Sequence, residues 1–386
     1  MKVTTPKYYN KFKCIADKCE DTCCKGWEIV IDKNTLKKYK NNKSDFAKIL
    51  NSKIILYEDN EPGFRLEGNR CPFLNENNLC DIYINLGEDN LCNTCKLFPR
   101  VIEQYGNIKE ISLSLGCPES ARILLGQKDK ITFQTWENDE SITDYNSLSF
   151  EMLSQIISAR NIAMSIIRNR KISLSNRIFL YLSFSREIQD CIDKFEISKI
   201  TEVKEKFKDE RYLNELLNKA NEFKPKEHKK YETVKQYLDL FKQLESINNT
   251  WLNELQKTYD NLYKNYNLEY LVNIHKCFFK YYKEKIYEYE NIMMYFVFRY
   301  FMKSLNDCNL LPKVILSIFS LIIIIELDVS TWISNNKVLE FKDQVYIVHL
   351  FSKEVEHSED NIIKLYELFE SEEIFSLENI INVILN

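Results

Sequence analysis

The chain has 386 residues, of which 45% are hydrophobic and 28% are charged, and its formal net charge is −4 at pH 7. This composition is typical of a soluble globular protein, and the length is sufficient for two domains. The slightly acidic balance argues against binding to nucleic acid, because phosphate backbones select basic surfaces.

The first 13 residues contain lysines and tyrosines but no apolar run. We therefore expect no signal peptide and a cytoplasmic location. Thiols in the cytosol stay reduced, so the cysteines of this chain are more readily explained as metal ligands than as disulfides.

The N-terminal part reads as short elements joined by loops. Residues 27–32 (WEIVID) alternate like a short strand, and residues 35–48 look like a short amphipathic helix. Such a segment has little apolar core of its own, and metal ligation would supply the missing folding energy.

The distribution of glycine marks a domain boundary. All seven glycines lie between Gly26 and Gly126, and only Pro225 and Pro312 follow them. A long stretch without glycine is poor in tight turns. We therefore predict a mainly α protein, with a small Cys-rich metal-binding N-terminal domain (residues 1–126) of short strands and loops and a larger all-helical domain (residues 127–386).

Apolar residues at helical spacing support this division. Residues 246–250 are predicted to be a loop between two such stripes. Residues 224–230 (KPKEHKK) are predicted to be a solvated connector that precedes the first of these two stripes. The four stripes are Met152, Ile156, Ala163 and Ile167; Val234, Tyr237, Leu238 and Phe241; Leu252, Leu255, Tyr259, Leu262 and Tyr266; and residues 292–302.

Residues 310–327 form the most apolar segment of the chain. Their uncharged part, residues 314–325, is 12 residues long and is bounded by Lys313 and Glu326. A membrane span needs about 20 apolar residues. We therefore expect a buried core helix and no membrane span.

The cysteines are the residues that indicate a particular chemistry, which is metal binding. Nine of the twelve cysteines lie in the first 117 residues without a histidine among them, a donor set suited to zinc or an iron–sulfur cluster. The predicted metal ligands are Cys14, Cys19, Cys23, Cys24, Cys71, Cys80, Cys92, Cys95 and Cys117. The isolated Cys191, Cys277 and Cys308 are expected to be small buried apolar residues.

The spacing leaves the number of metal centres open. Cys92 and Cys95 have the two-residue separation of a metal knuckle. Cys23 and Cys24 are adjacent, and we expect their side chains to diverge, so that they serve different centres or one of them is a spectator. Nine thiols could supply two four-thiolate centres, or one such cluster and several buried thiols. The odd count weakens disulfides further.

Four blocks of sequence, which together cover about the first 125 residues, form a recognisable pattern. The blocks are residues 12–27 with Cys19, Cys23, Cys24, Gly26 and Trp27; residues 71–80; residues 92–100 (CNTCKLFPR); and residues 113–122 (LSLGCPESAR). In order and spacing they resemble the flagellin lysine N-methylases, within the wider group that carries a CxxCxxCC-type metal-chelating domain. One departure is that four residues separate Cys14 from Cys19, where the broad pattern has two.

The resemblance implies a protein-lysine N-methyltransferase. It would methylate ε-amino groups of flagellin lysines with S-adenosylmethionine as donor, and would carry an iron–sulfur cluster, of the 4Fe-4S type, or zinc on the N-terminal cysteines. Flagellin would be the partner. The resemblance does not identify a catalytic residue.

The donor site is not of the Rossmann type. That fold needs a Gly-rich turn after its first strand, and no G-x-G occurs here. One hypothesis is that an open iron of the cluster chelates the amino and carboxylate groups of the donor. The Cys-x3-Cys-x2-Cys spacing of radical enzymes is absent, because Cys24 directly follows Cys23.

Two residues outside the cysteine set are candidates for cofactor binding. Arg100 could pair with a carboxylate of the donor or tune the charge of a cluster, and its structural alternative is a salt bridge after a turn. Trp27 is expected to pack against the metal centre, with a groove role as the second reading.

Four charged residues are read as structural. Glu20 and Asp21 read as a solvated capping pair beside the ligands, and Arg122 and Arg160 read as surface residues with a possible groove role.

The sequence is also compatible with two other functions. The protein could be a non-catalytic zinc- or iron-chelating binding module, or the metal could staple a loop-rich domain onto a helical scaffold for partner contacts.

Overall fold

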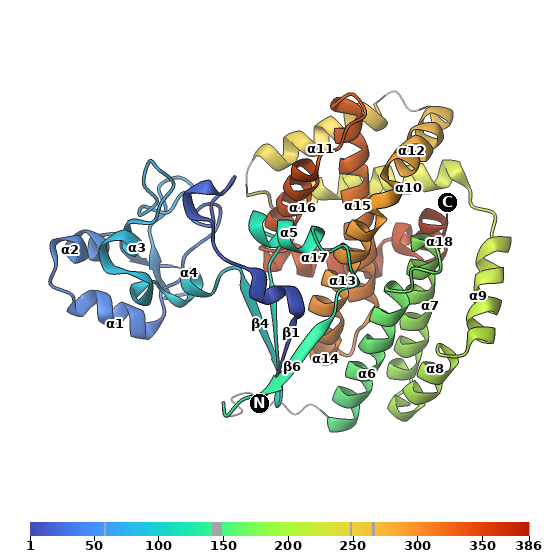
Figure 1. The fold of residues 1–386 in the computed structure, drawn as a ribbon, viewed down its shortest axis with the longest axis horizontal. Coiled ribbons are helices and arrows are strands. Elements are labelled where there is room, and N and C mark those ends of the chain that lie inside the picture. The colour runs from blue at the N-terminus through green and yellow to red at the C-terminus, as the bar shows by residue number, and fades with distance from the viewer. Residues whose placement is uncertain (58, 141–148, 248, 265–266, 386) are drawn as a thin grey trace.

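The computed structural model describes residues 1–57, 59–140, 149–247, 249–264 and 267–385. A small lobe with the cysteine-rich loops projects from a large helical body, and a sheet lies where the two meet (Figure 1). The predicted fold class, mainly α with a Cys-rich N-terminal part of short elements and a larger helical part, is confirmed.

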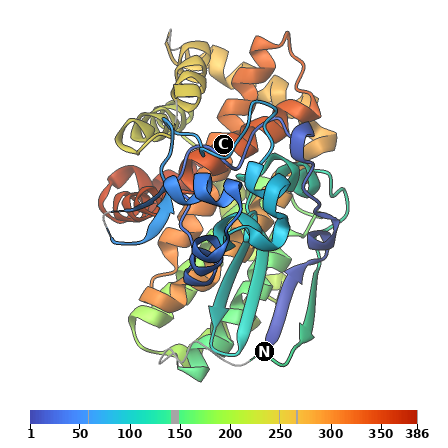
Figure 2. The same ribbon diagram turned by 90° about the vertical axis from the view of Figure 1, so that its left-hand side faces the viewer.

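The sheet has four strands in the order β4-β5-β1-β6. β1 pairs in parallel with β5 and antiparallel with β6, while β4 and β5 form a hairpin. Figure 2 shows the four strands side by side below the small lobe. The sequence analysis missed this sheet, and β6 lies in the part expected to be all-helical. The strands are β1 (Lys2–Pro6), β4 (Arg100–Tyr105), β5 (Ile108–Leu113) and β6 (Phe133–Glu137).

The small lobe has a core of its own around Ile29, Tyr39 and Phe64, against which several cysteines pack. Its elements are α1 (Lys33–Asn41), α2 (Asp45–Ser52), the hairpin of β2 (Ile54–Leu56) and β3 (Pro62–Phe64), α3 (Asp81–Leu86) and α4 (Asn93–Leu97).

Two predicted elements of this lobe are wrong in detail. The single helix expected at residues 35–48 is two helices, because the Ser44 side chain accepts a hydrogen bond from the backbone N–H of Ala47 and starts a new helix there. Residues 27–32 do not form a regular strand. Ile29 and Ile31 are buried as the alternation predicts, but Val30 makes only an isolated bridge to Gly63.

The helical body follows, with one strand, β6, between its first two helices. Its helices are α5 (Pro118–Leu125), α6 (Phe150–Ile167), α7 (Leu174–Asp193), α8 (Ile200–Lys206), α9 (Glu210–Glu222), α10 (Glu227–Leu240), α11 (Asn249–Leu262), α12 (Leu268–Tyr282), α13 (Ile286–Tyr300), α14 (Ser304–Asp307), α15 (Leu311–Ser334), α16 (Phe341–Val355), α17 (Glu359–Ser371) and α18 (Leu377–Ile384).

The predicted apolar stripes coincide with α6, α10, α11 and α13. Leu252 is the exception within its stripe, since 41% of it is exposed, and Tyr266 lies outside the described residues. The predicted connector at residues 224–230 is only half correct, because α10 already begins at Glu227.

α15 is the central helix of the body. By length and composition it could cross a membrane, but 83% of its most apolar 18-residue window is buried inside the protein. It contacts α7, α11, α13, α16 and α17. The expectation of a buried core helix is confirmed.

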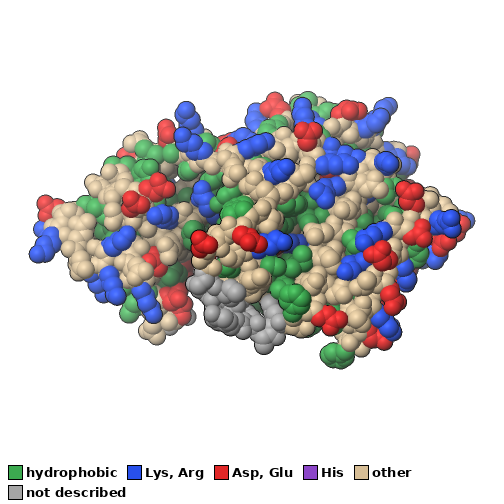
Figure 3. Space-filling view, turned by 60° about the horizontal axis from the view of Figure 1, so that its bottom comes forward, with side chains coloured by type: hydrophobic (Ala, Val, Ile, Leu, Met, Phe, Trp, Pro, Cys, Tyr) green, Lys and Arg blue, Asp and Glu red, His purple; other side chains and the backbone are tan. Residues whose placement is uncertain are grey.

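Charged side chains of both signs are interspersed over the face seen in Figure 3. This face carries no basic stripe of the kind that follows a nucleic-acid backbone.

Apolar packing in the described residues forms two clusters. One lies within residues 29–92, and the other runs from Tyr8 through the sheet to α18. The boundary at residue 126 stays a prediction.

Candidate metal centre

Three of the nine cysteines sit directly before a helix. Cys80, Cys92 and Cys117 are the N-cap residues of α3, α4 and α5. The first turn of a helix leaves backbone N–H groups without an intrahelical partner, and these favour negative charge. Each of these positions therefore suits a thiolate.

Backbone N–H groups do point at these sulfur atoms. The Cys80 sulfur accepts from Ile82 and Tyr83, and the Cys117 sulfur accepts from Glu119 and Ser120. Hydrogen bonds of this type stabilise a charged thiolate and orient it as a ligand.

Eight of the nine thiols form one connected group, in which each interacts electrostatically with at least one other. Cys71 interacts electrostatically with Cys80, Cys92 and Cys23. Cys95 interacts with Cys92, Cys24 and Cys71. At the edge of the group, Cys117 interacts with Cys23 and Cys19.

The adjacent cysteines do not diverge as expected. The thiols of Cys23 and Cys24 are in hydrogen-bonding contact, and this contact, followed by burial, raises the pKa of Cys23. Both sulfurs can therefore serve the same part of the cluster. The ninth predicted ligand, Cys14, is exposed on the segment that leads into the lobe.

The chemistry of this donor set fits zinc or iron, because thiolates that accept backbone hydrogen bonds are the usual ligands of both. Among the described residues, no three or more Cys, His, Asp or Glu side chains already surround a single point as ligands do. The fit therefore rests on donor type, clustering and hydrogen bonding.

Burial makes two of the thiols harder to ionise than a free cysteine. Burial raises the pKa of Cys71 to about 12, with further increases from the neighbouring Cys80 and Cys92. Burial also raises the pKa of Cys19 to about 11. Metal binding must displace these protons, so the affinity for metal should rise with pH.

The cluster is tied to α16 by Asp21. Its carboxylate accepts a hydrogen bond from His349 Nε2 at 2.9 Å and forms an ion pair with Lys353, and both of these side chains are about 95% buried. Burial opposes the charge of Asp21, but His349 and Lys353 hold the pKa of this carboxyl far below its usual range. Asp21 is thus a contact between the small lobe and the helical body and not part of a solvated capping pair.

Trp27 lies on the same contact. Its ring stacks on His357 with centroids 4.4 Å apart and lies 5.5 Å from the ring of Phe98, while Lys353 lies 5.3 Å from its centroid. These contacts are with Phe98 and with the helical body, and the expectation that Trp27 packs against the metal centre stays a prediction. A role in cofactor binding stays a prediction.

His357 is held in a tight corner between α16 and α17. A Cβ at Gly116 would lie 2.5 Å from His357 Nε2, which has no hydrogen-bond partner although it is buried. Burial, together with the charges of Arg299 and Lys353, lowers the pKa of His357 to about 4. The imidazole is therefore neutral at physiological pH.

Arg100 begins β4, and its Nε donates to the Tyr9 hydroxyl at 3.2 Å while its guanidinium lies 5.4 Å from the Phe12 ring centroid. It makes no salt bridge within the described residues, so its structural role differs from the expected one. Arg100 anchors the segment that leads to Cys14, and its predicted role in cofactor binding stays a prediction.

The remaining charged candidates are not free surface residues. Arg122 on α5 forms ion pairs with Glu20 and Glu119. Arg160 on α6 is 4% exposed and pairs with the equally buried Glu110 of β5, with Arg160 Nη1 at 2.6 Å from a carboxylate oxygen. Arg160 therefore fixes the sheet to the helical body, contrary to the surface reading.

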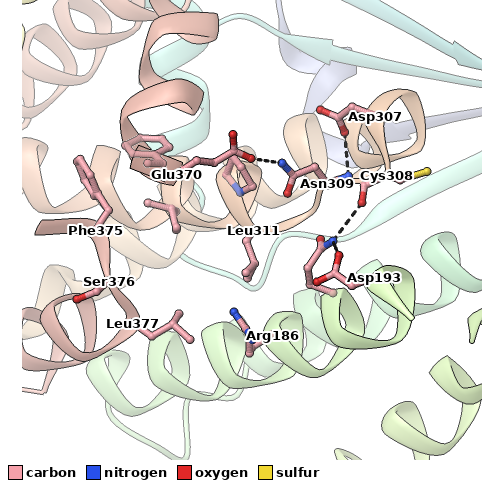
Figure 4. A pocket seen from close by; sticks show the side chains of 14 residues that line it. Arg186, Asp193, Asp307, Cys308, Asn309, Leu311, Glu370, Phe375, Ser376 and Leu377 are labelled. Atoms are coloured by element: carbon pink, nitrogen blue, oxygen red, sulfur yellow. Dashed lines mark hydrogen bonds between the residues drawn. The ribbon is translucent and has the colours of Figure 1, made fainter. Parts of the chain in front are cut away.

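The three isolated cysteines are only partly as expected. Cys191 is buried, but Cys277 and Cys308 are exposed. Cys308 has a left-handed φ of 56° and lines a cavity of about 610 Å³, where its sulfur points away from the other labelled side chains (Figure 4).

Sequence reasoning missed His349, Lys353 and His357. They lie more than 200 residues beyond the cysteines, and nothing in their spacing points to the metal lobe. The one signal that could have drawn attention to the two histidines is that histidine is rare, since the chain has four in all.

Two family models match the chain. The model of the FliB lysine N-methylase C-terminal domain matches residues 160–383, and the CxxCxxCC model, described as "Putative zinc- or iron-chelating domain", matches residues 13–114. The first model alone covers more than half of the chain. The chain belongs to the FliB lysine N-methylase family.

Curated relatives of this FliB-family protein come from Salmonella. A "Lysine-N-methylase" of S. typhimurium is 39% identical over 134 residues, which is 33% of each chain. The "Flagellar biosynthetic protein FliU" of S. muenchen is 39% identical over 134 residues, 33% of this chain and 79% of its own. The match thus spans about a third of the curated lysine-N-methylase. No solved structure matches this fold.

Proposed function

We propose that this protein is a cytoplasmic lysine N-methyltransferase that methylates ε-amino groups of flagellin, with S-adenosylmethionine as donor. The cysteines of the small lobe, with Cys14 at their margin, would hold a metal centre, a 4Fe-4S cluster in the first instance and zinc as the alternative. The family membership supports the reaction class, and the relative named "Flagellar biosynthetic protein FliU" supports a flagellar substrate.

The observation that carries the proposal is the direct contact between the cysteine cluster and the helical body. Asp21, two residues from Cys19 and Cys23, pairs with His349 and Lys353 of α16. A merely structural staple within the lobe would not need a buried ion pair to a helix more than 300 residues away. The contact supports a reaction site that the cysteine lobe and α16 would share.

The reaction sets one requirement on this site. The lysine nitrogen attacks the methyl carbon of the sulfonium, the carbon–sulfur bond breaks, and a proton leaves the nitrogen. Removing that proton beforehand at pH 7 costs about 4–5 kcal/mol from the usual pKa of lysine. A site that removes water and offers an acceptor lowers this cost.

The chain's own residues around the contact suit such a site. His357 is neutral, so it does not repel an incoming ammonium, and Trp27 already holds one cation, Lys353, 5.3 Å from its ring centroid. We assign Trp27 and Arg100 as candidate donor contacts. A metal centre, when bound, would supply Lewis-acid chemistry or a charge that orients the donor.

The test is incubation of anaerobically purified protein with unmethylated flagellin and S-adenosylmethionine, read by mass spectrometry. We expect added methyl mass on flagellin lysines. Absence of that mass from metal-loaded protein would contradict the proposal and favour the chelating module.

Metal analysis and visible absorbance of the same sample separate the two kinds of centre. An iron–sulfur cluster gives a coloured protein with iron and sulfide. A colourless protein with one or two zinc ions would contradict the cluster and leave the zinc alternative.

A further inference from the structure

A cavity of about 820 Å³ lies in the helical body, away from the cysteine lobe. It is enclosed by α7, α10, α12, α13, α15 and α18, and its volume is in the range that holds small-molecule ligands. Neither Asp21 nor Trp27 lines this cavity, and neither do the residues of the helical body that they contact.

The floor of this cavity is a strip of the most apolar helix that is only partly buried. Between Pro312 and Ser330 of α15, every residue is buried except Ile322 and Ile325, and both line the cavity together with Ile318. Leaving these residues beside water costs free energy in proportion to the apolar area. The strip is therefore suited to an apolar ligand body.

The deep carboxylates of the cavity are already satisfied. Glu290 is bound by Arg177 at 2.6 Å and by Arg170 at 2.9 Å. Glu326 accepts hydrogen bonds from the Tyr263 hydroxyl at 2.8 Å and from His275 at 3.0 Å. Neither carboxylate is left to attract a cationic ligand.

The cations at the rim are not compensated in this way. Lys171 and Lys283 both line the cavity, are exposed, and make no ion pair with any residue in the described part of the chain. Glu284 is the one exposed carboxylate among the lining residues. Lys230 adds a further amine deeper in the cavity, where it interacts with Glu326. The charged side chains that line the cavity therefore carry a net positive charge.

We propose that this cavity binds a small amphipathic anion, with its apolar chain on Ile318, Ile322 and Ile325 and its carboxylate or phosphate at the rim beside Lys171 and Lys283. The site is independent of the methyltransferase proposal and of any metal.

The probes are dodecanoate and dodecyl phosphate below their micellar concentrations, titrated into the full-length protein by calorimetry. We expect at least one to bind, and the tighter of the two identifies the head group. Dodecyltrimethylammonium, with the same tail and the opposite charge, should bind at least about tenfold more weakly.

The double variant Lys171→Met/Lys283→Met should weaken anion binding about fivefold to tenfold, because each exposed cation contributes modestly. Lys280→Met is the matched control, since Lys280 lies three residues before Lys283, near the end of α12, and does not line the cavity. Ile322→Trp should fill the floor and abolish binding, and its melting temperature reports whether the fold is kept.

Four results would overturn the proposal. The first three are no binding of either anion to the wild-type protein, equal binding of the cationic probe, and unchanged affinity in the double lysine variant. Full affinity in a folded Ile322→Trp variant would place any binding elsewhere and would also refute this site.

Discussion

The cysteines differ from one another in their surroundings at the scale of single residues. Cys71 is buried at the centre of the cluster, whereas Cys14 is exposed at its margin. Removing a central ligand should weaken metal binding more than removing a marginal one, because the remaining thiols cannot close around the ion.

We therefore expect Cys71→Ser to lower the metal content of the purified protein severalfold, measured by elemental analysis. Cys277→Ser is the matched control, since Cys277 lies on α12, apart from the cluster. Equal metal content in the two variants would contradict the assignment of Cys71 as a ligand.

Asp21 is the second residue whose role can be isolated. Asp21→Asn leaves the buried Lys353 without its counter-charge, and breaking a buried ion pair typically costs about 3–5 kcal/mol. Because 30% of the Asp21 side chain is exposed, we expect a smaller loss of about 2 kcal/mol in the free energy of unfolding, measured with urea.

Asp17→Asn provides the comparison, because Asp17 is exposed on a neighbouring turn. If both variants unfold at the same urea concentration, the contact between Asp21 and α16 does not contribute to stability.

At the scale of elements, the corner between α16 and α17 gives a pH dependence. The pKa of His357 is about 4 in the folded protein, below the usual value of about 6.5. Between these values the unfolded chain binds a proton that the folded protein does not. Stability contributed by neutral His357 is therefore present above about pH 6.5 and is lost as the pH falls towards 4.

His357→Phe keeps a ring against Trp27 and removes the titration. We expect the loss of stability between pH 7.5 and pH 5, followed by urea unfolding, to be smaller than in the wild type. His228→Gln should leave the wild-type profile unchanged, because His228 is exposed on α10. An unaltered profile in His357→Phe would refute the assignment of this pH dependence to His357.

At the scale of the whole molecule, the two apolar clusters should respond differently to loss of metal. The cluster within residues 29–92 is small, whereas the other includes the sheet and the long helices. Small Cys-rich modules depend on their metal for folding energy.

A chelator should thus increase hydrogen exchange in residues 29–92 while α15 remains protected, as measured by mass spectrometry. The protected α15 peptides serve as the internal control. Uniform exchange throughout the chain, or no change in the small lobe, would contradict this division of stability.

The sequence determined the parts of this protein that depend on local pattern. Apolar residues at spacings of three and four predicted α6, α10, α11 and α13, and the short uncharged run bounded by Lys313 and Glu326 predicted a core helix. The nine clustered cysteines predicted a metal lobe, and four blocks of sequence predicted the family. Each of these signals is a spacing or an order of residues along the chain, and none depends on how distant segments pack.

Only the tertiary structure decided how distant segments meet. The strands of the sheet are five or six residues long and come from residues 2–137, so their pairing has no periodic signature. Asp21 contacts His349 and Lys353 across more than 300 residues, and Ile322 and Ile325 of α15 line a cavity because the surrounding helices bury them only in part. Buried charges and cavities arise from packing, and packing brings together residues whose separation in the sequence is arbitrary.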